Sequence, residues 1–107
     1  MSEERQLKIM RFLENNPEMT QRELASTLGI SLGAANFCLR ALVDKGWIKL
    51  DNFKKNNNKL GYLYLMTSKG LVAKTKLTVQ FLKRQLLEYD ELKTEIEGLE
   101  KELLRKL

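Results

Sequence analysis

Two short helical segments, separated by only a few residues, constrain the fold of this 107-residue chain more than any other feature. The first lies in "TQRELASTLGI", where Thr20 and Glu23 have the spacing of a capping box. Leu24 and Leu28 are four residues apart and share one face of this helix. Gly29 follows directly and suits the left-handed residue that ends a helix. We therefore predict a capped helix of about two turns.

The second segment is "SLGAANFCLRALVDKG", in which Ser31 is the expected N-cap. We predict a helix from about Leu32 to Lys45, ended by Gly46. Its buried stripe has helical spacing and consists of Ala35, Leu39, Leu42 and Val43. Two short helices joined by "LGIS" have the length and chemistry of a helix-turn-helix.

The flanking segments extend this motif. Apolar residues between Leu7 and Leu13 predict a preceding helix, with Ser2 as a candidate N-cap. After Gly46, the segments "WIKLDNF" and "LGYLYLMT" alternate apolar and polar residues, which is typical of strands. Six lysines and asparagines, Lys54 to Lys59, lie between the two segments. We interpret them as the tip of a β-hairpin, the wing of a winged helix-turn-helix.

The last third of the chain predicts one long helix, with Thr67 and Ser68 as cap candidates. Apolar residues recur at the a and d positions of three heptads, which favours pairing with a second copy of the chain. These candidate dimerisation residues are Leu82, Tyr89, Leu92, Ile96, Leu99 and Leu103. The alternative is that the helix folds back onto its own domain. The predicted fold is mainly α with a small β-hairpin: a winged helix-turn-helix domain at residues 1–68 and a coiled-coil-like dimerisation helix at residues 69–107.

The composition excludes several classes of protein. The chain has no histidine, which removes a histidine general base, a Ser-His triad and an imidazole metal site. Its one cysteine, Cys38, forms no CxxC zinc motif, and we interpret it as a small buried hydrophobe rather than a redox switch. No glycine-rich phosphate loop or signal-peptide pattern is present. We predict a cytoplasmic protein that is not an enzyme and has no cofactor and no metal.

The charge is distributed unevenly. The net charge is +5, but residues 88–107 hold seven acidic and four basic residues, a net of −3. The basic excess therefore lies in residues 1–87, which include the helix-turn-helix and the wing. This distribution favours an anionic partner for the first part of the chain and helix pairing for the last part.

In a helix-turn-helix, the N-terminal part of the second helix enters the major groove of DNA. Asn36 is suited to adenine, Arg40 to guanine or phosphate, and the wing lysines to phosphate. The candidate DNA contacts are Gln21, Arg22, Ser31, Leu32, Gly33, Asn36, Phe37, Arg40, Lys54, Lys55, Asn56, Asn57, Asn58 and Lys59. The competing interpretation is that these are ordinary solvated residues.

Three stretches resemble the small MarR-type regulators associated with exopolysaccharide gene clusters. They are "TQRELASTLGISLGAANFCLRALVDKGWIK", "NFKKNNNKLGYLYLMTSKG" and "LTVQFLKRQLLEYDELKTEIEGLEKE". The resemblance covers the chain from about Gln6 to Glu102. It implies a bacterial DNA-binding transcriptional regulator that is usually dimeric. The chain is shorter than a typical MarR protein, and its C-terminal region is one helix rather than an elaborated bundle.

We therefore predict a sequence-specific regulator that binds double-stranded DNA, forms a homodimer through its C-terminal helix and does not enter a membrane. No small-molecule effector is assigned. The alternative is a winged-helix module that binds another protein and has no specific affinity for DNA.

Overall fold

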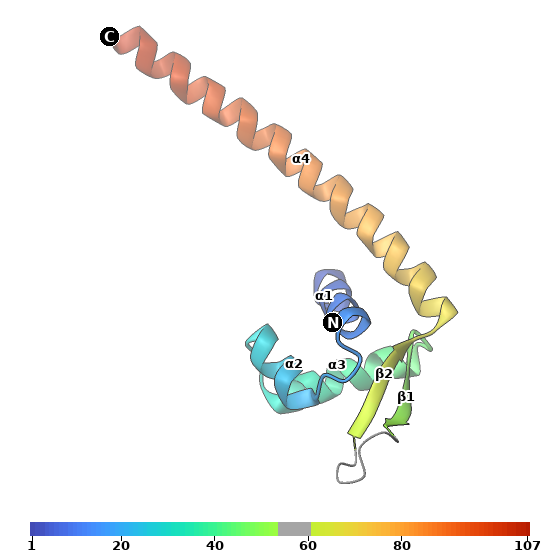
Figure 1. The fold of residues 1–107 in the computed structure, drawn as a ribbon. Coiled ribbons are helices and arrows are strands. Elements are labelled where there is room, and N and C mark those ends of the chain that lie inside the picture. The colour runs from blue at the N-terminus through green and yellow to red at the C-terminus, as the bar shows by residue number, and fades with distance from the viewer. Residues whose placement is uncertain (54–60) are drawn as a thin grey trace. The chain divides into compact units, whose positions relative to one another are not determined.

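The computed structural model describes residues 1–53 and 61–107. The elements follow in the order α1 (Glu3–Asn15), α2 (Gln21–Leu28), α3 (Leu32–Asp44), β1 (Ile48–Phe53), β2 (Gly61–Met66) and α4 (Ser68–Lys106) (Figure 1). Two compact units are present, Met1–Leu77 and Thr78–Leu107. The fold predicted from the sequence, a winged helix-turn-helix followed by one long helix, is confirmed.

Each of the first three helices begins at a residue whose hydroxyl accepts a hydrogen bond from a backbone N–H three positions later. The distances are 3.1 Å at Ser2, 3.1 Å at Thr20 and 3.0 Å at Ser31. Gly29 has φ +68° and ends α2 in the left-handed region, as its position in the sequence predicts. The chain turns through 108° between α2 and α3, within the range of a helix-turn-helix.

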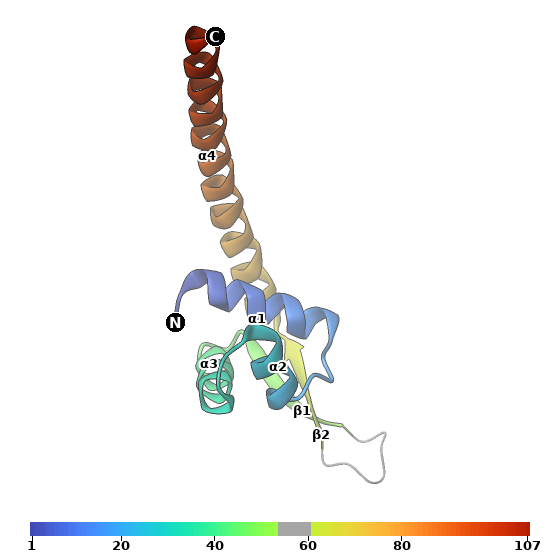
Figure 2. The ribbon, with the colours of Figure 1, turned by 90° about the vertical axis from the view of Figure 1, so that its left-hand side faces the viewer.

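The core of the first unit lies between the three helices and the hairpin. Figure 2 shows the ribbon of these elements from a second side. Its largest fully buried side chains come from α1, α2, α3 and β1: Ile9, Met10, Leu13, Leu24, Leu39, Leu42, Ile48 and Cys38. The predicted stripe of α3 is therefore buried, except that Val43 is only half-buried. Cys38 is 2% exposed, which confirms that it packs as a hydrophobe.

The hairpin is antiparallel, with Ile48 opposite Met66 and Leu50 opposite Tyr64. The strand β1 begins at Ile48, so Trp47 precedes it rather than belonging to it. The backbone N–H of Tyr64 donates to the carbonyl oxygen of Pro17 at 3.0 Å, which joins β2 to the segment between α1 and α2. The hairpin is thus attached through β2 to the segment between α1 and α2, and Ile48 of β1 is buried in the core.

The start of α4 is attached to the segment between α3 and β1 through Thr67. The Thr67 hydroxyl donates to the carbonyl oxygen of Gly46 at 2.5 Å and accepts from the N–H of Gly70 at 3.0 Å. The Thr67 N–H donates to the carbonyl oxygen of Trp47 at 3.0 Å. Gly70 is buried against this segment. Thr67 is therefore both the cap of α4 and the link between the hairpin and the helix.

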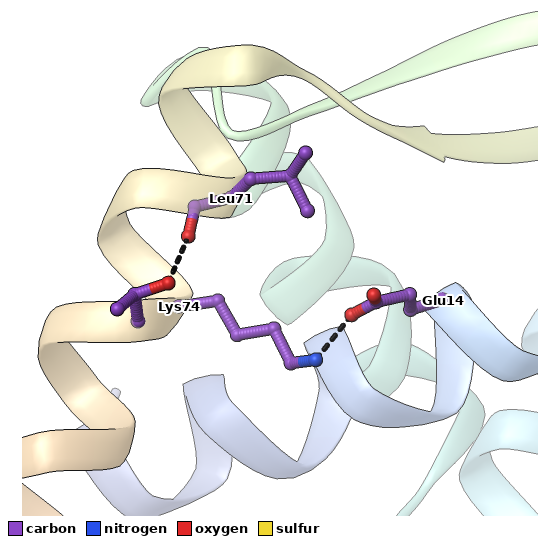
Figure 3. Close-up of polar contacts among 4 residues, drawn as sticks. Glu14, Leu71 and Lys74 are labelled. Atoms are coloured by element: carbon purple, nitrogen blue, oxygen red, sulfur yellow. Dashed lines mark hydrogen bonds and ion pairs between the residues drawn. The ribbon is translucent and has the colours of Figure 1, made fainter.

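The next turns of α4 also contact the first unit. Figure 3 shows the ammonium group of Lys74 paired with the carboxylate of Glu14 in α1. Within α4, the hydroxyl of Thr75 donates to the Leu71 carbonyl oxygen at 3.0 Å. Leu77 is buried. The first compact unit consequently extends to Leu77.

No single helix in the two described ranges is long and apolar enough to cross a membrane. Taken together, the bent pair α2 and α3 reaches the length and the apolar composition of a membrane span. Several of its apolar side chains belong to the core just described.

Candidate nucleic-acid interface

The outer face of α3 is the side turned away from the core. Gly33, Phe37 and Arg40 are exposed there, and Phe37 is 67% exposed. These residues line a shallow depression together with Asn36, Ala41 and Asp44. The burial of Ala35, Leu39 and Leu42 on the opposite side fixes this orientation. The predicted contacts Gly33, Phe37 and Arg40 are thus brought together on one accessible surface.

The first turn of α3 adds Ser31 and Leu32. The Ser31 hydroxyl already accepts from the Ala34 N–H, so it serves as a helix cap. The Leu32 side chain is 45% exposed. Both residues lie at the end of α3 that carries the positive end of the helix dipole and therefore favours anions such as phosphate.

Asn36 and Gln21 contact each other, which the sequence did not indicate. The side-chain amide nitrogen of Gln21 donates to the Asn36 amide oxygen at 3.3 Å and to the Tyr64 hydroxyl at 3.3 Å. Tyr64 is 5% exposed, while Gln21 and Asn36 are half-buried. Through Gln21, these hydrogen bonds link α2 to α3 and to β2. They therefore help to fix the orientation of α3 relative to the hairpin.

This contact reduces the number of hydrogen-bonding groups on Gln21 and Asn36 that remain free to bind DNA. Both amide protons of Gln21 are used within the domain. Among the residues that the structure describes, no partner takes the amide protons of Asn36, and its oxygen has a second lone pair. That these two residues contact DNA stays a prediction. Sequence reasoning missed Tyr64 as a polar partner, because its contact depends on the hairpin register and on the packing of β2.

The remaining predicted contacts divide into two groups. Arg22 lies in the first turn of α2 and is exposed. The wing residues lie outside the described residues: Lys54, Lys55, Asn56, Asn57, Asn58 and Lys59.

The predicted dimerisation residues all lie on α4. Their side chains are between 46% and 66% exposed in this chain: Leu82, Tyr89, Leu92, Ile96, Leu99 and Leu103. An exposed apolar stripe with heptad spacing is what a paired helix presents before pairing.

Residues 2–49 match a family model described as winged helix-turn-helix DNA-binding. No curated protein matches the sequence. Among solved structures, a cysteine-to-serine mutant of MarR from E. coli is 30% identical, with a TM-score of 0.61, over 92% of this chain and 75% of that chain.

Wild-type apo MarR from E. coli gives a similar match: 28% identity and a TM-score of 0.63, over 90% of this chain and 74% of that chain. A MarR protein from Peptoclostridium difficile has the same fold at 19% identity and a TM-score of 0.67, over 94% of this chain and 65% of that chain.

The fold and the outer face of α3 define a winged helix-turn-helix DNA-binding protein. The chain belongs to the MarR family of transcriptional regulators, as the resemblance in the sequence implied. The members of this family are regulators and not enzymes, so the prediction that the chain has no enzymatic activity is confirmed.

Proposed function

We propose that this chain is a dimeric transcriptional regulator that recognises a specific DNA sequence. The observation that carries the proposal is the accessible outer face of α3, where Arg40 and Phe37 project from a helix whose other face is buried. Inserted into the major groove, this face reaches the base edges, and Arg40 supplies donors for guanine or phosphate. A solved MarR mutant from E. coli, 28% identical to this chain, is in complex with operator DNA.

The wing extends the proposal to the DNA backbone. Lys54, Lys55 and Lys59 bring three positive charges to one loop, and the three asparagines between them are suited to donate to phosphate or sugar oxygens. Arg22 and Gln21, at the start of α2, are the further proposed contacts to the DNA backbone. For Gln21 the contacting group would be its backbone N–H, because both of its side-chain amide protons are used within the domain. The wing and the "LTVQFLKR" stretch resemble those of MarR-type regulators associated with exopolysaccharide gene clusters. This resemblance supports the proposal that the target genes are of that kind. Reaching that DNA implies a cytoplasmic location.

The dimer is the third part of the proposal. In each of the two copies, the domain at residues 1–68 would bind one half-site of the DNA. The helices at residues 69–107 would pair the two copies through the stripe from Leu82 to Leu103. Linking two half-sites raises affinity by effective concentration and doubles the sequence that is read.

A protein-interaction module is the second candidate function. It is favoured by the apolar character of the exposed residues Leu32 and Phe37, since exposed aromatic residues are enriched at protein interfaces. The test is fluorescence anisotropy with a duplex enriched from a random-sequence pool by repeated rounds of binding, called the selected duplex below. Salt-resistant preference for it over a scrambled duplex supports the regulator. The absence of duplex binding supports the interaction module.

Replacing Arg40 with alanine is expected to weaken binding to the selected duplex by about 5- to 150-fold, the effect of removing about 1–3 kcal/mol that one arginine contributes. Arg40 is exposed, so the variant should remain folded. Anisotropy titrations of both proteins measure the change. The matched control is Arg11→Ala, which removes the same charge from an exposed position of α1. Equal reductions of affinity in the two variants would mean that Arg40 acts only through net charge.

Replacing Lys54, Lys55 and Lys59 together with alanine is expected to flatten the salt dependence of binding. The slope of log K against log salt should fall by about 0.9 for each phosphate that the variant no longer neutralises, while the preference for the selected over the scrambled duplex is mostly kept. Arginine at the same three positions keeps the charge and is the control. A slope that alanine leaves unchanged would contradict the role of the wing.

A further inference from the structure

The outer face of α3 offers few hydrogen-bonding groups for a DNA-reading surface. The Ser31 hydroxyl caps the helix, and the Asn36 amide oxygen already accepts from Gln21. Arg40 carries donors only. The two most exposed large side chains in the first half of the helix, Leu32 and Phe37, are apolar. Sequence reading by this helix therefore has to rely on apolar contacts as well as on hydrogen bonds.

The exposure of Phe37 is not required by the fold. Its side chain is 67% exposed on the outer face, while Ala35, Cys38 and Leu39 beside it in the sequence form the core. A phenylalanine in water gives up the favourable free energy that burial provides. An aromatic ring at the centre of the surface predicted to enter the groove is therefore best explained by a contact made in the complex.

Gly33 lies one turn before Phe37, on the same side of the helix. A glycine within a helix destabilises it by about 1 kcal/mol relative to alanine. Its backbone does not have a positive φ, and the nearest atom to an added Cβ is the Ser31 hydroxyl oxygen at 4.0 Å. Neither the conformation nor the packing of this chain requires a glycine here. The bare backbone leaves open space beside the Phe37 position.

We propose that Phe37, with the open position at Gly33, reads the 5-methyl groups of thymines in the major groove. The thymine methyl is the apolar group that base edges present in that groove, and phenylalanine is suited to contact it. Gly33 allows the groove edge to come close enough for the ring to cover the methyl. This inference rests on the proposed DNA-binding function and names a feature of the target: thymine beside the bases or phosphates that Arg40 contacts.

The test replaces the thymines of the selected duplex with uracil, one position at a time, which removes the methyl and keeps the base pairing. With the wild-type protein, one or two positions are expected to show an affinity reduced about three- to fivefold, the effect of one buried methyl group. With Phe37→Ala, the thymine duplex should bind more weakly and the thymine-to-uracil affinity ratio at those positions should fall to about one. Phe37→Leu should keep part of the ratio.

The second variant separates DNA binding from folding. Gly33→Ala is expected to raise or preserve thermal stability, because the added methyl meets open space in a helix. The same variant should weaken binding to the thymine duplex severalfold. Gly98→Ala is the matched control, since its added methyl meets no atom within 4 Å and lies on α4. It should leave DNA binding unchanged.

The outcomes distinguish this inference from the proposed function. If the wild-type protein prefers the selected duplex and uracil has no effect at any position, the methyl-reading role of Phe37 is overturned and the regulator remains. The same holds if Phe37→Ala keeps the full thymine preference. If selected and scrambled duplexes bind equally, the proposed function fails and this inference fails with it.

Discussion

Gly70→Ala is expected to destabilise the first compact unit strongly. A Cβ at residue 70 would lie 1.9 Å from the carbonyl oxygen of Trp47 and 2.8 Å from its carbonyl carbon. These are backbone atoms of the segment between α3 and β1, and the Thr67 hydrogen bonds hold this segment against α4. The clash can be relieved only by moving α4 or the start of the hairpin.

The expected decrease in the free energy of unfolding is about 3 kcal/mol or more, at or above the upper end of the usual range for overpacked sites. For a unit of this size, each kcal/mol corresponds to a shift of about 4–8 °C in Tm, so the melting temperature should fall by more than about 10 °C. Trp47 is the single tryptophan of the chain and is adjacent to the clash. Its fluorescence during thermal and urea unfolding measures the effect.

Gly98→Ala is the control, because it makes the same substitution in the same helix. No atom lies within 4 Å of a Cβ at Gly98, so alanine should stabilise the helix by about 1 kcal/mol. If both variants change stability by the same amount and sign, the close contact between Gly70 and Trp47 is wrong.

Ile96→Asp is expected to convert the proposed dimer into a monomer. Ile96 lies at the centre of the heptad stripe of α4 and is exposed in the single chain. In a paired helix, burying it in each copy contributes about 1.5–3 kcal/mol, and a buried carboxylate adds a further desolvation cost. The dimer dissociation constant should therefore rise by more than about 100-fold. Analytical ultracentrifugation over a concentration series measures the change.

The matched control is Leu87→Asp, which introduces the same charge at a position on the far side of the stripe. Leu87 is 61% exposed and has the f position of the heptad. This variant should remain dimeric. Ile96→Asp should also bind the selected duplex at least about 100-fold more weakly, because the two DNA-binding domains are no longer linked to each other. If Leu87→Asp dissociates the dimer and Ile96→Asp does not, a different face of α4 forms the interface.

The helix ends were predictable because their causes are local. The hydroxyls of Ser2, Thr20 and Ser31 each reach a backbone N–H three residues away, and Gly29 needs only its own backbone freedom. The hairpin was predictable from the alternation of its two strands. These features require no knowledge of distant parts of the chain.

The roles of the two α4 glycines were not predictable in this way. Both appear in the sequence as helix-weakening residues, yet Gly70 lies against Trp47 and Gly98 has open space around its Cα. The difference arises from tertiary packing. The same holds for Gln21 and Asn36, which look like free DNA contacts in the sequence. In the fold, Gln21 donates to Asn36 across the packing of α2 on α3, and to Tyr64 of β2.

Because Cys38 is buried, the reactivity of its thiol reports local unfolding around α3. The single thiol lies in the middle of α3, 2% exposed among the core residues, so an alkylating reagent reaches it only when that helix separates from the core. The labelling rate, compared with the rate of the unfolded chain, gives the free energy of that opening without any engineered reporter. If the labelling rate is measured with and without the selected duplex, its decrease on adding the duplex shows how much DNA binding stabilises α3 against local opening.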